Sequence, residues 1–369
     1  MQLVQTTRDA LLKPLSTVAG IVERRNTLPI LANILMRKEG NKVAFIATDL
    51  EVQITTHADF GVGDDNESTT VAARKLLDIL RALPELGDVK LGLASAKLSI
   101  QSGKSRFALQ TMGAAEFPTL SQPEKWDVSL SLPQKTLKHL FNMVHFAMAQ
   151  QDIRYYLNGL LFVFEPGLVR AVATDGHRLA HSATAVEGIT EKHDVIVPRK
   201  TVLEMQRLLA DTDDLVSIDV APGQIRFRFG DVELVSKLVE GKFPDFTRVI
   251  PNNYTRHFSV SRELLQGSLQ RAAILTTDKL KGVRIQLSDH QLKISSSNAE
   301  QEEAQEEIDI DYSHEPLDVG FNVSYLLDVL ANVKTETLQW SVQPDVNASA
   351  LITSPDDDQF KYVVMPMRI

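Results

Sequence analysis

The stretch VATDGHRLA, residues 172–180, places an Asp, a His and an Arg within four positions after a run of apolar residues. The same ATD occupies residues 47–49, at an offset of 126 residues. A third relative, HQLKISSSNAEQ, puts Ser296, Ser297 and Asn298 in the same frame about 123 residues further on. Each copy alternates apolar residues as a strand does and then ends in a small polar turn. The first copy has neither His nor Arg after its Asp, so Asp49 and Asp175 are most simply turn residues.

Other motifs recur at the same spacing. ARKLLDIL (73–80), PRKTVLEM (198–205) and VSYLLDVL (323–330) share an apolar–acid–apolar core, and AEFPTL (115–120) matches GKFPDF (241–246). The chain of 369 residues therefore consists of three copies of one unit. Two helical patterns and several alternating strands per copy predict an α+β fold, in which antiparallel sheets carry helices on one face. We expect three domains, at 1–125, 126–254 and 255–369.

The charge of the chain is unevenly distributed. The six windows of helical periodicity, at 7–22, 72–83, 133–149, 198–210, 261–273 and 323–335, together carry a net charge of +8, whereas the whole chain carries −9. Either each helix shows a solvated polar face, or the helices form a positive surface that meets phosphate without reading bases. The segment QQDIRYYLNG (150–159) leaves a similar choice, because its Arg and paired Tyr can contact a sugar–phosphate chain or pack in a core.

No catalytic or metal motif stands out. The chain lacks a Gly-rich phosphate loop, HExxH and GxSxG, and it has no Cys, which excludes disulfides and thiolate sites. The acidic run at 300–311 lacks the Gly turn of a calcium loop. We therefore expect no cofactor, no metal and no enzyme activity, although a hydrolase that uses Asp175 and His177 stays open as an alternative. No signal peptide or membrane span is expected, and a cytoplasmic location fits.

The motifs YYLNG, VATDGHRLA, IVPRK, FPDF, GFNVSYLLDVL and YVVMPMRI, in this order, resemble the β subunit of bacterial DNA polymerase III, the replicative sliding clamp. The resemblance covers essentially the whole chain. It implies the DNA clamp fold, in which two three-domain chains close head to tail into a pseudo-sixfold ring that encircles duplex DNA. Such a ring is not an enzyme and would tether the DNA polymerase III α subunit, the clamp loader, other polymerases and repair proteins through short linear peptides. A three-repeat scaffold that never touches DNA stays open as the other alternative.

The resemblance also implies site residues. The residues expected to contact DNA are Arg25, Arg74, Gln151, Tyr155, Tyr156 and Lys200. Whether Arg24 or Arg25 makes the main contact stays open, because the two are adjacent. The pocket for partner peptides carries over to Leu157, Thr174, Gly176, His177, Arg178, Leu179, Pro244, Arg248, Val249, Asn322, Tyr325, Val346, Val363, Val364, Met365, Pro366, Met367, Arg368 and Ile369. The sequence departs from the family at Leu280 and in the loop 347–361, which leaves Ala348 and Ser349 unassigned.

The dimer interface is expected between the first and third repeats. KSRFALQ (104–110) alternates as an edge strand does, and the acids near residue 300 form a complementary surface. The expected interface residues are Lys75, Lys97, Lys104, Arg106, Phe107, Leu109, Ile274, Leu275, Glu300, Glu302, Glu303 and Glu306. At the chain's end, we expect Tyr362–Met365 to close a sheet, with the strand ending at Pro366 and Met365–Ile369 walling the cleft.

Overall fold

The computed structural model describes residues 1–23, 27–277 and 281–369. The chain folds into two compact units, of which unit 1 contains Met1–Lys135 and Arg207–Leu238, and unit 2 contains Thr136–Gln206 and Val239–Ile369. The second repeat contributes strands to both units. Within the described residues, no helix combines the length and the apolarity needed to cross a bilayer.

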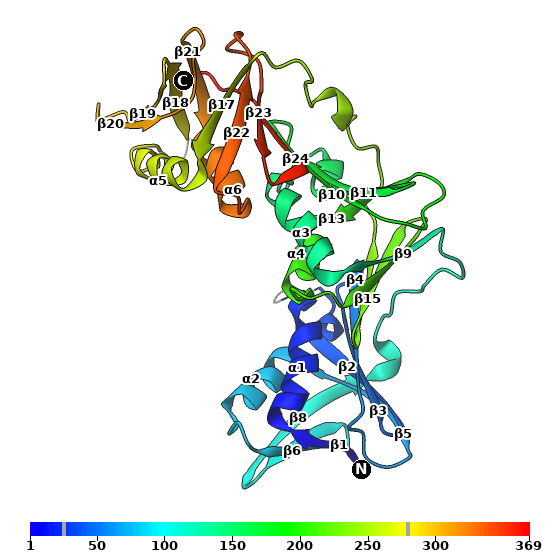
Figure 1. The fold of residues 1–369 in the computed structure, drawn as a ribbon. Helices are drawn as coiled ribbons and strands as arrows, with labels where there is room; N and C mark the ends of the chain where they lie inside the picture. The colour runs from blue at the N-terminus through cyan, green and yellow to red at the C-terminus, as the bar shows by residue number, and fades with distance from the viewer. Residues whose placement is uncertain (24–26, 278–280) are drawn as a thin grey trace. The chain divides into compact units, whose positions relative to one another are not determined.

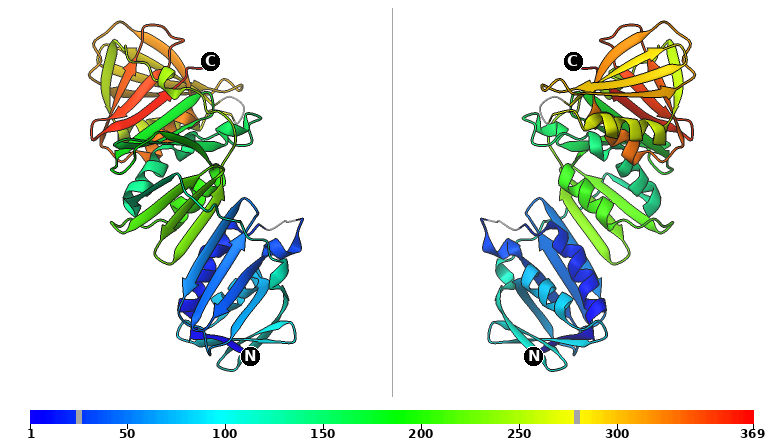
Figure 2. Two further views of the ribbon diagram at one scale, coloured as in Figure 1. Left: turned by 90° about the vertical axis from the view of Figure 1, so that its right-hand side faces the viewer. Right: turned by 90° about the vertical axis from the view of Figure 1, so that its left-hand side faces the viewer.

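Unit 1 is built on one antiparallel sheet in the order β1-β6-β7-β8-β5-β2-β3-β4-β16-β15-β14-β9. Its elements are β1 (Gln2–Thr7), α1 (Arg8–Val18), β2 (Asn33–Glu39), β3 (Lys42–Thr48), β4 (Val52–Ala58), β5 (Asn66–Ala72), α2 (Ala73–Ala82), β6 (Asp88–Ala94), β7 (Lys97–Ser102), β8 (Ser105–Gly113), β9 (Val128–Pro133), β14 (Leu215–Ala221), β15 (Gln224–Phe229) and β16 (Val232–Lys237). The pairing of β4 with β16 joins strands of the first and second repeats. Helices α1 and α2 lie side by side on one face of this sheet (Figure 2).

Unit 2 contains two antiparallel sheets, in the orders β13-β10-β11-β12-β24-β23-β22-β17 and β20-β19-β18-β21 (Figure 1). Its strands are β10 (Gly159–Glu165), β11 (Leu168–Thr174), β12 (Arg178–Ala185), β13 (His193–Pro198), β17 (Arg256–Ser261), β18 (Gly282–Ser288), β19 (Gln291–Ser297), β20 (Glu303–Asp309), β21 (Leu317–Asn322), β22 (Thr337–Val342), β23 (Ala350–Ser354) and β24 (Asp357–Val364). Helices α5 (Arg262–Ala273) and α6 (Val323–Asn332) pack together. Two of the points where the chain passes between the units fall in α3 (Gln134–Val144) and α4 (Arg199–Leu208).

The helices form where the apolar periodicity predicts them. In α1, Leu11, Leu15 and Val18 are buried on one face, and the Thr7 side chain caps the first turn by accepting from the Ala10 N–H at 3.3 Å. Asn322 caps α6 in the same way, accepting from the Ser324 N–H at 2.9 Å. All six predicted helical windows contain a helix, so this part of the prediction is confirmed.

The first two repeated strand ends form the same turn, and the third forms a related one. Asp49 Oδ1 accepts from the backbone N–H groups of Glu51 and Val52 at 2.9 and 2.7 Å, and Asp175 Oδ1 accepts from those of His177 and Arg178 at 2.9 and 3.1 Å. In the third copy, Asn298 Oδ1 accepts from Glu300 and Glu302 at 3.1 and 2.9 Å. The interpretation of Asp49 and Asp175 as turn residues is therefore confirmed.

We predict that Asp49→Ala lowers the free energy of unfolding of unit 1 by about 1–2 kcal/mol, because two backbone donors lose their acceptor. Asp49→Asn keeps an oxygen at the same place and is expected to retain most of the stability. Urea denaturation of the two variants measures the difference, with Asp59→Ala, an exposed Asp of the same unit, as the control. Equal loss in Asp49→Ala and the control would contradict the prediction.

Candidate functional site

An apolar cleft of about 350 Å³ opens in unit 2 around the turn between β11 and β12. Its walls come from the loop before β10, from this turn, from the segment after β16 and from the end of β24. The lining residues are Arg154, Tyr156, Leu157, Thr174, Gly176, His177, Arg178, Leu179, Phe243, Pro244, Val249, Ser349, Val363 and Met365.

Strand pairing brings the end of the chain to this turn. β24 lies beside β12, with Val364 opposite Arg178 and Val363 opposite Leu179. The Met365 N–H extends the ladder by donating to His177 O at 2.9 Å. Beneath the cleft, Val363 and Leu179 are buried in one apolar cluster with Phe243. The floor is therefore rigid core, whereas Val249 and Met365 at the rim are 42% and 49% exposed.

The turn itself is held by a short side-chain network. Gly176 has a φ of +92°, in the left-handed region that favours glycine, and Arg154 Nη1 lies close to where a Cβ would stand. Arg154 donates to Asp175 O at 3.1 Å and to Asp152 Oδ2 at 2.8 Å. The hydrogen bonds from Arg154 lower the pKa of Asp152 to about 2. The wall of the cleft beside Gly176 thus carries an Arg154–Asp152 ion pair.

Arg178 connects the turn to helix α6. Its guanidinium donates from Nε to Asp175 Oδ2 at 3.1 Å and from Nη1 to Asp328 Oδ2 at 2.6 Å. It also lies 4.3 Å from the centroid of the Tyr325 ring, a cation–π distance. Because the side chain is almost fully buried, Arg178 is a structural link as well as a lining residue.

Comparison with known proteins identifies the family to which this chain is similar. Models of the DNA polymerase III β subunit match residues 1–121 (N-terminal domain), 131–245 (central domain) and 247–368 (C-terminal domain). The chain is 45% identical over 363 residues to the β sliding clamp of Pseudomonas putida and 42% identical over 362 residues to that of Escherichia coli K12, with 98% of both chains covered in each case. The crystal structure of the Pseudomonas aeruginosa DNA polymerase sliding clamp with a ligand matches with a TM-score of 0.95 and 43% identity over the whole of both chains.

The chain belongs to the DNA polymerase III β subunit family. It acts as the β sliding clamp of DNA polymerase III and is a non-catalytic processivity subunit with the three-domain α+β clamp fold. A crystal structure of the P. aeruginosa clamp bound to griselimycin matches equally well, with a TM-score of 0.95 and 44% identity over the whole of both chains.

The hydrolase alternative is therefore wrong, and the geometry of the clamp explains the misleading motif. Both carboxylate oxygens of Asp175 are engaged in the turn and by Arg178. His177 is exposed in the turn, whereas His181 is buried in β12, with its Nδ1 3.0 Å from Gln359 O. Burial lowers the pKa of His181 to about 4, so its imidazole is neutral at ordinary pH. The two His side chains differ in setting and do not form a pair.

Several residues expected in the cleft lie elsewhere in the clamp. Val346 and the last four residues, from Pro366 to Ile369, line a second hollow of about 520 Å³ together with Arg284 and Asp318. The last residue of β24 is Val364, the Met365 N–H still donates to His177 O, and the Met367 N–H donates to Gly320 O at 2.8 Å. Of Met365–Ile369, only Met365 lines this cleft, and the wider expectation for the end of the chain stays a prediction.

Four other expected pocket residues do not line the cleft. Asn322 caps α6, Tyr325 stacks on Arg178, and Val364 is buried in β24. The Arg248 side chain is 85% exposed and pairs with Asp245. Conversely, the sequence did not predict Phe243, Arg154 or Ser349 as lining residues, and Tyr156 lines the cleft although it was assigned to DNA. Phe243 stands in the repeated Phe-Pro motif, which was the available signal.

The residues assigned to DNA differ in setting. Arg74 is exposed on α2 of unit 1, and Lys200 is partly exposed on α4. Gln151 is exposed with a φ of +55°, and Tyr155 is 57% exposed, with its ring centroid 5.8 Å from that of Tyr156. Arg24, Arg25 and Leu280 lie outside the described residues.

The residues assigned to the dimer include two strand edges, and the others lie on α2, on β7, directly after α5 and directly before β20. The first half of β8 pairs only with β7, and β5 joins β8 at Thr111–Gly113, so residues 105–110 have one unpaired edge. β20 is the outer strand of the four-stranded sheet. Among the acids of β20, Glu306 accepts hydrogen bonds from Arg271 at 2.7 and 2.9 Å. Glu303 accepts none from Arg271.

Proposed function

We propose that the cleft around the β11–β12 turn binds short linear peptides of the DNA polymerase III α subunit, the clamp loader, and other polymerases and repair proteins. The supporting observation is the mostly apolar cleft itself, with Val249 and Met365 exposed at its rim over a buried floor. Its size falls within the range of small-ligand and peptide pockets, and its few polar groups suit orientation rather than chemistry. Apolar side chains of an extended peptide would gain most from this burial.

The cleft proposal predicts that Val249→Asp weakens binding of a peptide from the polymerase α-subunit tail by at least roughly tenfold, because a charge must then be desolvated at the rim. The exposure of Val249 means that the variant should fold. Fluorescence polarisation with a labelled peptide measures the change. Leu86→Asp, at a fully exposed site of unit 1, is the matched control. Unchanged affinity in Val249→Asp would refute the cleft as the peptide site.

We also propose that two chains close head to tail into a ring through β8 of one chain and β20 of the other. An unpaired strand edge is a template for another strand, and here one edge is basic and the other acidic. Lys104 and Arg106 flank the β8 edge, while Glu300, Glu302 and Glu303 lie at β20. Phe107 and Ile274, 39% and 76% exposed, would supply the apolar centre of this interface.

The ring proposal predicts that Ile274→Ala weakens the dimer more than Lys104→Ala. Burial of an Ile contributes about 1.5–3 kcal/mol, whereas a rim charge chiefly steers association. Sedimentation equilibrium across a dilution series gives the dissociation constants. A wild-type chain that is monomeric at micromolar concentration would refute the ring, and a larger loss in Lys104→Ala would refute the apolar centre.

We further propose that duplex DNA passes through this ring and meets basic side chains of the helices without base readout. The excess positive charge of the helical windows on an acidic chain supports this. Arg74 and Lys200 are the helical cations assigned to this role, with Gln151, Tyr155 and Tyr156 at the loop after α3. Low intrinsic affinity suits a ring whose link to DNA is topological.

The DNA proposal predicts that Arg74→Ala and Lys200→Ala weaken binding alike on all duplex sequences. Each is expected to flatten the slope of log affinity against log salt by about one unit, since one phosphate contact is lost. Titration of two unrelated duplexes over a salt series provides the measurement. A change in sequence preference, or a slope equal to that of the wild type, would contradict the assignment.

A further inference from the structure

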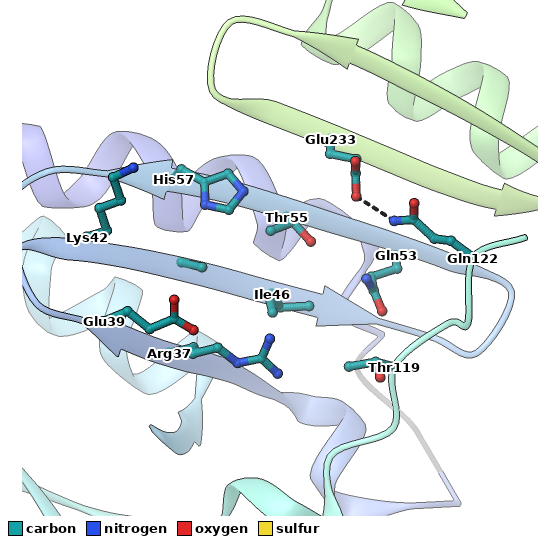
Figure 3. A pocket seen from close by; sticks show the side chains of 11 residues that line it. Arg37, Glu39, Lys42, Ile46, Gln53, Thr55, His57, Thr119, Gln122 and Glu233 are labelled. Atoms are coloured by element: carbon teal, nitrogen blue, oxygen red, sulfur yellow. Dashed lines mark hydrogen bonds between the residues drawn. The ribbon is translucent and has the colours of Figure 1, made fainter. Parts of the chain in front are cut away.

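Unit 1 carries a groove of its own, of about 460 Å³, on strands β2, β3, β4 and β16 (Figure 3). It occupies the sheet face opposite the helices. Thr56 on β4 donates to Pro14 O of α1 at 3.4 Å, so the even-numbered residues of β4 face the helices. Gln53, Thr55 and His57 alternate with them and line the groove instead.

The strand register explains why this face is hollowed. Arg37, Ala44 and His57 are direct neighbours across β2, β3 and β4. Because the middle residue carries only a methyl group, the two long side chains stand about 10 Å apart over an open floor. The next row places Ile46 beside Thr55 and Thr55 beside Glu233, which continues the floor toward β16.

One end of the groove is closed by the segment at 119–122. The Leu120 N–H donates to Gln53 Oε1 at 2.9 Å, and Gln122 Nε2 donates to Glu233 Oε1 at 2.8 Å, the bond drawn in Figure 3. Arg226 holds Gln122 from the other side at 2.7 Å. This end is therefore a fixed wall and not a loose loop.

The charged groups at the other positions have no partner within the part of the chain that the structure describes. The side chains of Arg37, Glu39, Lys42 and His57 make no hydrogen bond or ion pair there, although Glu39 and Lys42 are opposed in the register. Glu39 and Lys42 lie at one end of the groove, and Glu233 lies at the other end. Arg37 and His57 lie between them. The guanidinium of Arg37 thus has carboxylates on both sides of it along the groove.

We propose that this groove is a second docking site of the clamp, for an extended peptide segment of a partner protein that carries one carboxylate at its centre. One carboxylate of the segment pairs with the guanidinium of Arg37, which matches a carboxylate in a bidentate geometry. Ala44 and Ile46 give the segment an apolar floor, and Thr55 and Gln53 offer hydrogen bonds. Glu39 and Glu233 disfavour a polyanion such as a nucleic acid, because phosphates along its length would meet a carboxylate at each end.

The test is methyl NMR of the full-length clamp labelled at Ala and Ile methyl groups, since Ala44 and Ile46 report from the floor itself. The probes are a blocked pentapeptide, Thr-Val-Asp-Val-Thr, its Asn-substituted counterpart, and a thymidine oligonucleotide. We expect the Asp peptide to shift both methyl signals and to bind at least about tenfold more tightly than the Asn peptide, the difference that a charged hydrogen bond provides. Arg37→Gln should remove this preference, whereas Lys90→Gln, an exposed strand cation of unit 1 outside the groove, should not.

Ala44→Leu tests the groove without changing charge, because the larger side chain fills the floor and should abolish the Ile46 shift. Equal binding of the Asp and Asn peptides, or no shift with the Asp peptide, would overturn the proposal. A response to the oligonucleotide in place of the peptide would overturn it as well and assign the groove to nucleic acid. Since the peptide cleft lies in unit 2 and this groove in unit 1, either can fail without the other.

Discussion

The pairing of strands from different repeats is the constraint on which the rest of this clamp depends. β16 of the second repeat lies beside β4 of the first, and β24 at the end of the chain lies beside β12 of the second. Each pairing converts two strand edges that would otherwise be open into the interior of a sheet. The second pairing also creates the cleft, because it carries Val363 and Met365 to the β11–β12 turn. The groove of unit 1 depends in the same way on the first pairing, which supplies Glu233.

The repeat, the helices and the turns could be predicted from the sequence because local forces decide them. Apolar spacing fixes the buried face of a helix, and a carboxylate or amide oxygen two residues before a backbone N–H fixes a turn. Asp49 and Asp175 form the same turn although different residues come after them, and Asn298 forms a related turn with donors two and four residues later. The resemblance added most of the cleft, including Leu179 and Val363, which no local pattern marks as neighbours.

The features that could not be predicted from the sequence depend on long-range register. Ser349 reaches the cleft because β23 and β24 pair next to it, and Tyr156 lies there because the loop before β10 returns to the turn. The end of the chain was assigned to one site because Pro366 was taken as the end of the strand. The ladder does run to the Met365 N–H, just before Pro366, but the Met367 N–H then donates to Gly320 O of the other sheet. Local propensity cannot distinguish a tail that stays at the cleft from one that reaches the other sheet, because Pro366 ends the ladder in both cases.

The cleft also shows how a cluster of Asp, His and Arg can serve a binding protein. Catalysis by a carboxylate requires an oxygen free to accept a proton or attack a substrate, whereas both oxygens of Asp175 accept hydrogen bonds in the turn. Arg178, buried between Asp175 and Asp328, links the turn to α6 and so ties this wall of the cleft to a helix. A site that is already ordered loses less entropy on binding than a flexible one. Under the proposed function, each peptide contact at such a cleft can be short and exchangeable.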